Sequence, residues 1–246
     1  MLGLPGDVTA CLFDLDGVLT QTASVHRAAW QETFNDCLKR WEPKEEPLAP
    51  FDPADDYNDY VDGRARADGV RTFFGSRGIT LPEGSPDDPP ERDTVFGIGT
   101  RKNQILLRRI REEGVQVFDG AVTYLRAVEQ AGLHRAVVSA SENTEEVLAV
   151  TGLTVLFEVV VNGVTAKTEK LRGKPEPDTF LLAAQWLGVA PGQAAVFEDA
   201  VAGVAAGRAG GFGFVVGVDR VGHAEDLRRG GADVVVDDPV ELLEKP

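Results

Sequence analysis

The second half of the chain alternates short apolar runs with segments of helical periodicity. The run at 134–139 is followed by an amphipathic segment at 143–150, and the run at 194–197 by one at 200–209. Parallel strands need a crossover connection, usually a helix, so this alternation predicts an α/β fold with a doubly wound parallel sheet. The expected strands are 8–13, 134–139, 157–161, 194–197, 212–218 and 233–236, and the expected helices of this part are 119–131, 143–150, 177–187, 200–209, 224–229 and 240–244.

An acidic pair follows the first apolar run. Residues 8–13 are β-rich and too short for a helix, so we expect a buried strand that ends just before Asp14 and Asp16. At the two-residue period of a strand the two carboxylates share a face, and Gly17 lets the backbone turn away. A strand end that runs into a turn would also explain the pair. The later strand ends favour a ligand site instead, because parallel α/β sheets bind ligands at this edge.

Three more polar motifs stand at expected strand ends or helix starts. Ser139 ends the second strand, Lys174 precedes the proline that opens a helix, and Glu198 and Asp199 follow an apolar strand. Singly, they are explained as a helix cap, a surface lysine and an acidic helix start. With Asp14 they make a set that suits Mg²⁺ and a phosphoryl group, since carboxylates bind the cation while the lysine and the hydroxyl bind phosphoryl oxygens.

Residues 21–113 have a different character, because no β-rich run interrupts them. An all-helical insert directly after the first strand is the arrangement of a lid. We therefore expect a core domain of residues 1–20 and 114–246 and a helical cap domain of residues 21–113. The expected helices of the cap are 24–40, 61–78 and 100–113, and the expected loops, rich in Pro, Asp and Glu, are 41–59 and 81–93.

The composition narrows the choice of partners. A formal charge of −15 and a pI near 4.6 argue against nucleic acid and anionic membrane surfaces, both of which select basic faces. Cys11 and Cys37 form no disulfide framework, and buried free thiols suit a reducing cytoplasm. No basic, apolar leader or membrane-length apolar stretch is present. We expect a cytoplasmic monomer whose partner is a small molecule.

Taken together and in this order, the motifs resemble those of the haloacid dehalogenase superfamily of phosphoryl-transfer enzymes over residues 8–237. The resemblance implies a Rossmann-like core with an inserted cap. It implies that Asp14 is the nucleophile, which forms an aspartyl-phosphate, and that Asp16 is the general acid/base. It further implies that Ser139 and Lys174 grip the phosphoryl group and that Mg²⁺ is held by Asp14, the carbonyl of Asp16, Glu198 and Asp199.

Within that superfamily, the run 14–23, followed by His26 and Trp30, resembles the β-phosphoglucomutase family. There the positions of Thr22 and His26 lie at the hinge, and the histidine couples substrate binding to cap closure. The segment 61–69 resembles one in which an arginine, here Arg66, binds the second phosphate. Solvated charges on helix faces are the alternative. Further candidates in the same comparison are Lys102 for the sugar, Gly63, Ser141 and Asn143 for the substrate, and Arg64 if the register is shifted.

The resemblance implies a phosphosugar mutase. Phosphorylated Asp14 would convert β-glucose 1-phosphate to the 1,6-bisphosphate, and return of the other phosphate would leave glucose 6-phosphate; the bisphosphate is also the activating donor. Cap closure would exclude water. A phosphatase of a small sugar phosphate and a non-catalytic sugar-phosphate sensor remain alternatives, whereas 97–102 lacks the third glycine of a dinucleotide site. Glu142 stands where mutase relatives can carry a lysine, and it would repel a phosphate if it points inward.

Overall fold

The computed structural model describes residues 1–41, 48–61 and 66–243. The chain forms two compact units, a core unit of Met1–Thr22 and Val115–Pro246 and a cap unit of Ala23–Gly114. The division thus falls after residues 22 and 114, whereas the sequence places it after residues 20 and 113.

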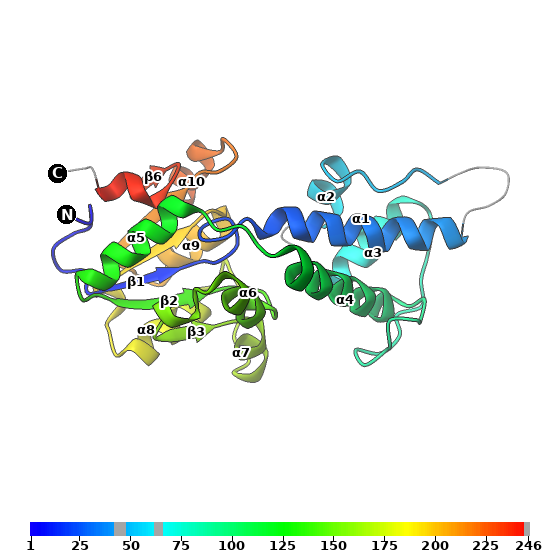
Figure 1. Ribbon diagram of the computed structural model, residues 1–246, viewed down its shortest axis with the longest axis horizontal. Helices are drawn as coiled ribbons and strands as arrows, with labels where there is room; N and C mark the ends of the chain where they lie inside the picture. Colours follow the sequence, from blue (N-terminus) through cyan, green and yellow to red (C-terminus); the bar gives the residue numbers. More distant parts are fainter. Residues whose placement is uncertain (42–47, 62–65, 244–246) are drawn as a thin grey trace. The chain divides into compact units, whose positions relative to one another are not determined.

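The described part of the core unit contains one sheet of parallel strands, in the order β3-β2-β1-β4-β5-β6 (Figure 1). This is the doubly wound order, in which successive strands run outward in opposite directions from β1 and β4. The α/β prediction is therefore confirmed. The strands are β1 (Ala10–Phe13), β2 (His134–Val138), β3 (Val159–Val161), β4 (Ala194–Glu198), β5 (Phe214–Val218) and β6 (Val234–Val236).

Helices of the core unit cover both faces of the sheet: α5 (Asp119–Gln130), α6 (Thr144–Thr151), α7 (Gly163–Thr168), α8 (Asp178–Leu187), α9 (Val201–Ala209) and α10 (Ala224–Gly230). On one face, Leu12 belongs to the same buried cluster as Phe180 of α8. On the other, the ring of Phe13 stacks on Phe197 at 4.5 Å and meets Tyr124 of α5 edge-on at 6.5 Å. Alternate residues of β1 thus face opposite helical layers, which explains why the strand is uniformly apolar.

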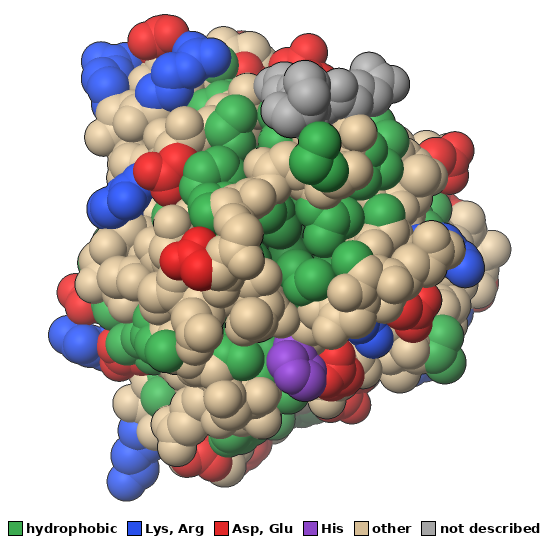
Figure 2. Space-filling model, turned by 90° about the vertical axis from the view of Figure 1, so that its left-hand side faces the viewer, with side chains coloured by type: hydrophobic (Ala, Val, Ile, Leu, Met, Phe, Trp, Pro, Cys, Tyr) green, Lys and Arg blue, Asp and Glu red, His purple; other side chains and the backbone are tan. Residues whose placement is uncertain are grey.

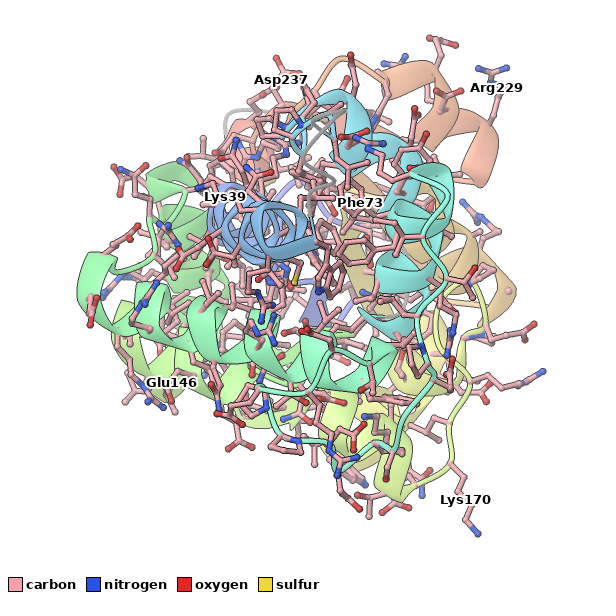
Figure 3. All side chains as sticks on the ribbon, turned by 90° about the vertical axis from the view of Figure 1, so that its right-hand side faces the viewer. Lys39, Phe73, Glu146, Lys170, Arg229 and Asp237 are labelled. Atoms are coloured by element: carbon pink, nitrogen blue, oxygen red, sulfur yellow. The ribbon has the colours of Figure 1, made fainter. Side chains whose placement is uncertain are left out.

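The cap unit is helical, with α1 (Thr22–Trp41, which begins in the core unit), α2 (Asp55–Tyr60), α3 (Arg66–Ser76) and α4 (Val95–Glu113). Aromatic rings fill its interior. Phe34 of α1 stacks on Phe73 of α3 at 4.1 Å between centroids, and Phe74 meets Phe34 edge-on at 5.2 Å. Figure 3 shows Phe73 directed toward α1, inside this cluster. The cap unit therefore has an apolar core of its own.

Two chain segments form a neck where the inserted residues leave and rejoin the core unit. The amide of Phe118 donates to the carbonyl of Leu19 at 3.0 Å, and the amide of Gln21 donates to the carbonyl of Gln116 at 2.9 Å. Thr20 and Val117 form an isolated antiparallel bridge between these bonds. Because the two segments pair, the ends of the insertion are held side by side.

The structure corrects several secondary-structure predictions. Of the helix expected at 61–78, α3 covers Arg66–Ser76, residues 62–65 lie outside the described part of the chain, and α2 begins within the segment 41–59 that was expected to be a loop. No helix was expected at 163–168, where α7 begins after Asn162, whose side chain accepts from the amide of Thr165 at 2.9 Å. The last helix is a 3₁₀ segment, Pro239–Leu243. Short elements were missed because a single turn has too few residues to show a period.

In the described ranges, no helix is long and apolar enough to span a membrane. On the face of the molecule shown in Figure 2, acidic and basic side chains are interspersed. That face therefore presents no broad field of one sign.

Candidate active site

Strand register brings two of the predicted carboxylates together. Phe13 of β1 is paired with Phe197 of β4, and the amide of Asp14 donates to the carbonyl of Phe197 at 2.9 Å. One step further along the two strands, Asp14 lies beside Glu198, and both side chains are almost completely buried. This is the C-terminal edge of the sheet between β1 and β4, where the strand order reverses and ligands of such folds bind.

Lys174 connects this pair. Its ammonium forms ion pairs with Asp14 and Glu198 and donates to the carbonyl of Val138 at 3.1 Å. Burial raises the pKa of Asp14 well above its usual value; Lys174 opposes that shift, and the surrounding carboxylates add to it. Burial also acts against the charged form of Lys174, but the two carboxylates outweigh it and raise the pKa of the amine. The lysine is thus the counter-ion of the acidic cluster.

Two hydroxyl groups orient Asp16. Thr22 donates from Oγ1 to Oδ1 of Asp16, and Ser139 donates from Oγ to Oδ2 at 3.2 Å. Thr22 and Ser139 are buried, at 1% and 2% exposure, so their rotamers are fixed by packing. Both residues were predicted from the sequence, and the structure places them on the same carboxylate.

Two glycines make room for the remaining acids. Gly17 has a φ of 85°, and a Cβ atom there would lie 1.8 Å from Oδ2 of Asp199. A Cβ atom on Gly203 of α9 would lie 1.9 Å from the carboxyl carbon of Glu198. Burial, followed by the charge of Glu198, raises the pKa of Asp199 to about 8. The positions of the Asp199 and Glu198 carboxylates therefore require glycine at residues 17 and 203.

The acidic residues have the donor chemistry of a Mg²⁺ site, since carboxylate oxygens are the ligands that this ion prefers. Oε1 of Glu198 is buried without a hydrogen bond of normal geometry, and a cation would also relieve the raised pKa values of Asp14 and Asp199. Among the described residues, however, no three His, Cys, Asp or Glu side chains converge closely enough to hold a metal. The donor chemistry thus suits the ion, while in this structure the ammonium of Lys174 lies between Asp14 and Glu198.

The predicted cap residues also lie close together within their own unit. Nζ of Lys102 is 3.2 Å from Nδ1 of His26 and lies 5.0 Å from the centroid of the Trp30 ring. Burial, Lys102 and Arg66 lower the pKa of His26 well below its usual value, so the ring is neutral and its Nδ1 accepts from the lysine. Arg66 packs against Gly99, where a Cβ atom would lie 3.4 Å from its side chain. The candidates Gly63 and Arg64 lie outside the described residues.

Ser141 and Asn143 are engaged in the loop that follows β2. The amide of Ser141 donates to Oγ of Ser139 at 3.1 Å, and the amide of Asn143 donates to Oγ of Ser141 at 3.1 Å. Between them, the carboxylate of Glu142 forms an ion pair with Lys167 of α7. These two hydrogen bonds therefore fix the loop, and binding of substrate by Ser141 and Asn143 stays a prediction.

An arginine in the loop after β5 was not among the residues predicted from the sequence. Arg220 donates from Nε to the carbonyl of Gly17 and from Nη2 to that of Val18, both at 3.3 Å. Its guanidinium lies 3.7 Å from the centroid of the Phe118 ring and forms an ion pair with Asp238 at 2.9 Å. Arg220 thereby connects the loop that carries Asp14 and Asp16 to the neck. The signal in the sequence was a charged residue just after an apolar strand.

His223 belongs to the same loop and was also overlooked. Its Nε2 lies 2.9 Å from the carbonyl oxygen of Asp199, to which it donates. Asp219 fixes the loop by accepting from the amides of Gly222 at 2.7 Å and His223 at 3.0 Å. The loop after β5 is therefore fixed by Asp219 and supports the backbone of Asp199 through His223.

Comparison with known proteins assigns this geometry to a family. A family model described as haloacid dehalogenase-like hydrolase matches residues 8–211. The β-phosphoglucomutases of Mycobacterium bovis and Mycobacterium tuberculosis are 58% identical to this chain over 247 aligned positions, which cover 99% of this chain and 94% of theirs. The chain belongs to the β-phosphoglucomutase-like family of the haloacid dehalogenase superfamily. The resemblance inferred from the motifs is confirmed.

Solved structures of the haloacid dehalogenase superfamily share the fold. A β-phosphoglucomutase from Clostridium difficile is 26% identical, with a TM-score of 0.72 over 96% of this chain and 93% of its own. A haloacid dehalogenase family hydrolase from Deinococcus radiodurans, solved with bound phosphate and sodium, is 32% identical, with a TM-score of 0.70 over 97% and 94% of the two chains. The protein is an enzyme of this superfamily, whose β-phosphoglucomutases generally use a metal cofactor.

Proposed function

We propose that this protein is a Mg²⁺-dependent β-phosphoglucomutase that converts β-glucose 1-phosphate to glucose 6-phosphate. The observation that carries the proposal is the 58% identity to two β-phosphoglucomutases over 99% of the chain. The buried cluster of Asp14, Lys174 and Glu198 supports it, because it places a carboxylate and a cation together where a phosphoryl group can be transferred.

In the proposed reaction Asp14 is the nucleophile. Its carboxylate oxygen forms a bond to phosphorus while the bond from phosphorus to the sugar oxygen breaks, and Lys174 stabilises the charge on the phosphoryl oxygens. Asp16 gives a proton to the departing oxygen and takes one from the attacking hydroxyl in the reverse direction. The bonds from Thr22 and Ser139 support this role, since they hold the Asp16 carboxyl in one orientation.

Asp14, the carbonyl of Asp16, Glu198 and Asp199 would hold the Mg²⁺ ion. When bound, the ion neutralises the acidic residues and stabilises negative charge on the phosphoryl oxygens. Without it, burial raises the pKa of Asp14 well above its usual value, which disfavours the charged form of the nucleophile.

In the cap unit, we assign the second phosphate and the sugar to Arg66 and Lys102, with His26 as the residue that senses the bound substrate. The neutral ring of His26 supports this assignment, because it accepts a hydrogen bond from Lys102 without adding charge. A mutase must hold a bisphosphate at both ends, whereas a phosphatase needs to hold only one. Glucose 1,6-bisphosphate is then the activating phosphoryl donor. We also propose that the enzyme acts as a cytoplasmic monomer.

A phosphatase of a small sugar phosphate is the second candidate, because the matching family model is described as a hydrolase. The two are separated by a coupled assay with β-glucose 1-phosphate, Mg²⁺ and a trace of glucose 1,6-bisphosphate, in which glucose 6-phosphate and inorganic phosphate are followed in parallel. We expect glucose 6-phosphate without matching phosphate release, and loss of both signals in Asp14→Asn. Release of phosphate with little glucose 6-phosphate would replace the mutase by the phosphatase.

A further inference from the structure

Glu142 stands close to the groups that bind the phosphoryl group, in a loop whose backbone is fixed. The loop begins at Ser139, and the amide of Gly163 donates to the carbonyl of Ser141 at 3.0 Å. A Cβ atom on Gly163 would lie 2.5 Å from the carbonyl oxygen of Ala140, so α7 packs directly against the loop. The first turn of α7 and the loop that contains Glu142 therefore form one rigid piece of the core unit.

Lys167 of α7 neutralises the charge of Glu142. The two side chains form an ion pair in which the lysine side chain is 76% exposed and the glutamate side chain 29% exposed. The lysine is therefore the more accessible partner of the pair, and its ammonium is open to an anion from solvent. An ammonium has three N–H donors, of which one suffices for the pair with Glu142.

The pair also forms part of a cavity that reaches the phosphoryl-binding groups. The cavity has a volume of about 150 Å³, and Glu142 and Lys167 line it together with Ser139, Lys174 and Thr179. Oγ1 of Thr179 is buried there without a hydrogen-bond partner. Cationic and hydroxyl donors therefore line a space next to Asp14, while Lys174 itself is already shared between Asp14 and Glu198.

We propose that Lys167 is a substrate-binding residue, held by Glu142 at the entrance to the phosphoryl site, where it attracts and contacts the phosphate of the sugar. The proposal rests on the proposed function and adds a residue to it. It explains how the site tolerates an acid at position 142, since the neighbouring helix supplies the positive charge. In this arrangement Glu142 is a positioning residue that acts through Lys167.

The test is the binding of inorganic phosphate, measured by titration calorimetry on the full-length protein with Mg²⁺, at low salt and at about 0.3 M NaCl. We expect Lys167→Met to weaken phosphate binding about five- to tenfold at low salt, and less at high salt, because an exposed charge acts through a screened interaction. The matched control is Lys170→Met. Lys170 is an exposed lysine three residues further on, and Figure 3 shows it projecting away from the protein.

Glu142→Gln provides the second arm. Glutamine keeps a side-chain oxygen that accepts from Lys167 but removes the negative charge, so the lysine stays in place with its charge uncompensated, and phosphate binding equal to or tighter than that of the wild type supports the proposal. Weaker binding in Glu142→Gln would overturn it, since the pair would then only clamp the loop. Equal binding by Lys167→Met and Lys170→Met would also overturn it. Because the ligand is inorganic phosphate, the result does not depend on whether the enzyme proves to be a mutase or a phosphatase.

Discussion

Replacement of Gly203 by alanine should have two opposite effects on the stability of the protein, each of roughly known size. A glycine inside a helix is less favourable than alanine by about 1 kcal/mol, so Gly203→Ala in α9 would stabilise an ordinary helix. Here the new Cβ would lie 1.9 Å from the carboxyl carbon of Glu198 and 2.0 Å from its Oε1. Glu198 is 1% exposed, so the carboxylate must move away from Lys174 and from the amide of Ala200, to which it is bonded at 3.1 Å.

The second effect is the larger one. Separation of a buried ion pair costs roughly 3–5 kcal/mol, which leaves a net loss of about 2–4 kcal/mol in the free energy of unfolding. For a chain of this size, that corresponds to a fall in Tm of about 4–16 °C. We also expect weaker activation by Mg²⁺, because Glu198 no longer faces Asp14.

Thermal unfolding by circular dichroism and a Mg²⁺ titration of activity measure both effects. The matched control is Gly75→Ala in α3, where a Cβ atom would meet nothing within 4 Å and the change should stabilise the protein by about 0.5–1 kcal/mol. A Gly203→Ala variant as stable as the wild type, with unchanged Mg²⁺ activation, would refute the reasoning.

Two further predictions concern His26 and Arg220. The pKa of His26 in the folded protein lies below the pKa of histidine in the unfolded chain, so the unfolded state binds the proton more tightly. The stability contribution of His26 is therefore full above about pH 6.5 and falls as the pH is lowered. Compared with the wild type, His26→Asn should show a smaller loss in Tm between about pH 7 and pH 5. Arg220→Met should lower the free energy of unfolding by about 1–3 kcal/mol and lower kcat more than it changes KM, because its bonds position the loop that carries Asp14, the proposed nucleophile. The control Arg229→Met, at an exposed site on α10 (Figure 3), should stay within about 0.5 kcal/mol; an equal loss in both arginine variants, or an equal acid loss in His26→Asn and wild type, would contradict these expectations.

The alternation of apolar runs and helical segments predicted the sheet because each strand is buried on both faces. All four residues of β1 are fully buried, and only an apolar β-rich run satisfies that environment. The site followed from the same fact, since polar residues directly after such runs must collect at one edge of the sheet. Asp14, Ser139 and Glu198 were found in this way, without any knowledge of the strand order.

The sequence could not predict contacts that depend on how separate elements pack. Arg220 bonds to the carbonyls of Gly17 and Val18, which are about two hundred residues away, and no local period marks such a contact. Lys167 lies on a helix of only six residues, too short to be recognised. The charge of Glu142 was visible in the sequence, whereas its partner became visible only when α7 was placed beside the loop.

The paired neck formed by residues 19–21 and 116–118 has a consequence for how such enzymes diversify. The free energy needed to close a flexible loop depends on the distance between its ends and rises by only about 0.6 kcal/mol for each doubling of its length. Here the hydrogen bonds of the neck fix that distance whatever lies between its ends. The core unit can therefore accept inserts of very different size with almost the same free energy of loop closure. New substrate ranges can then be acquired by replacement of the inserted residues, while the strand register that places Asp14 beside Glu198 stays the same.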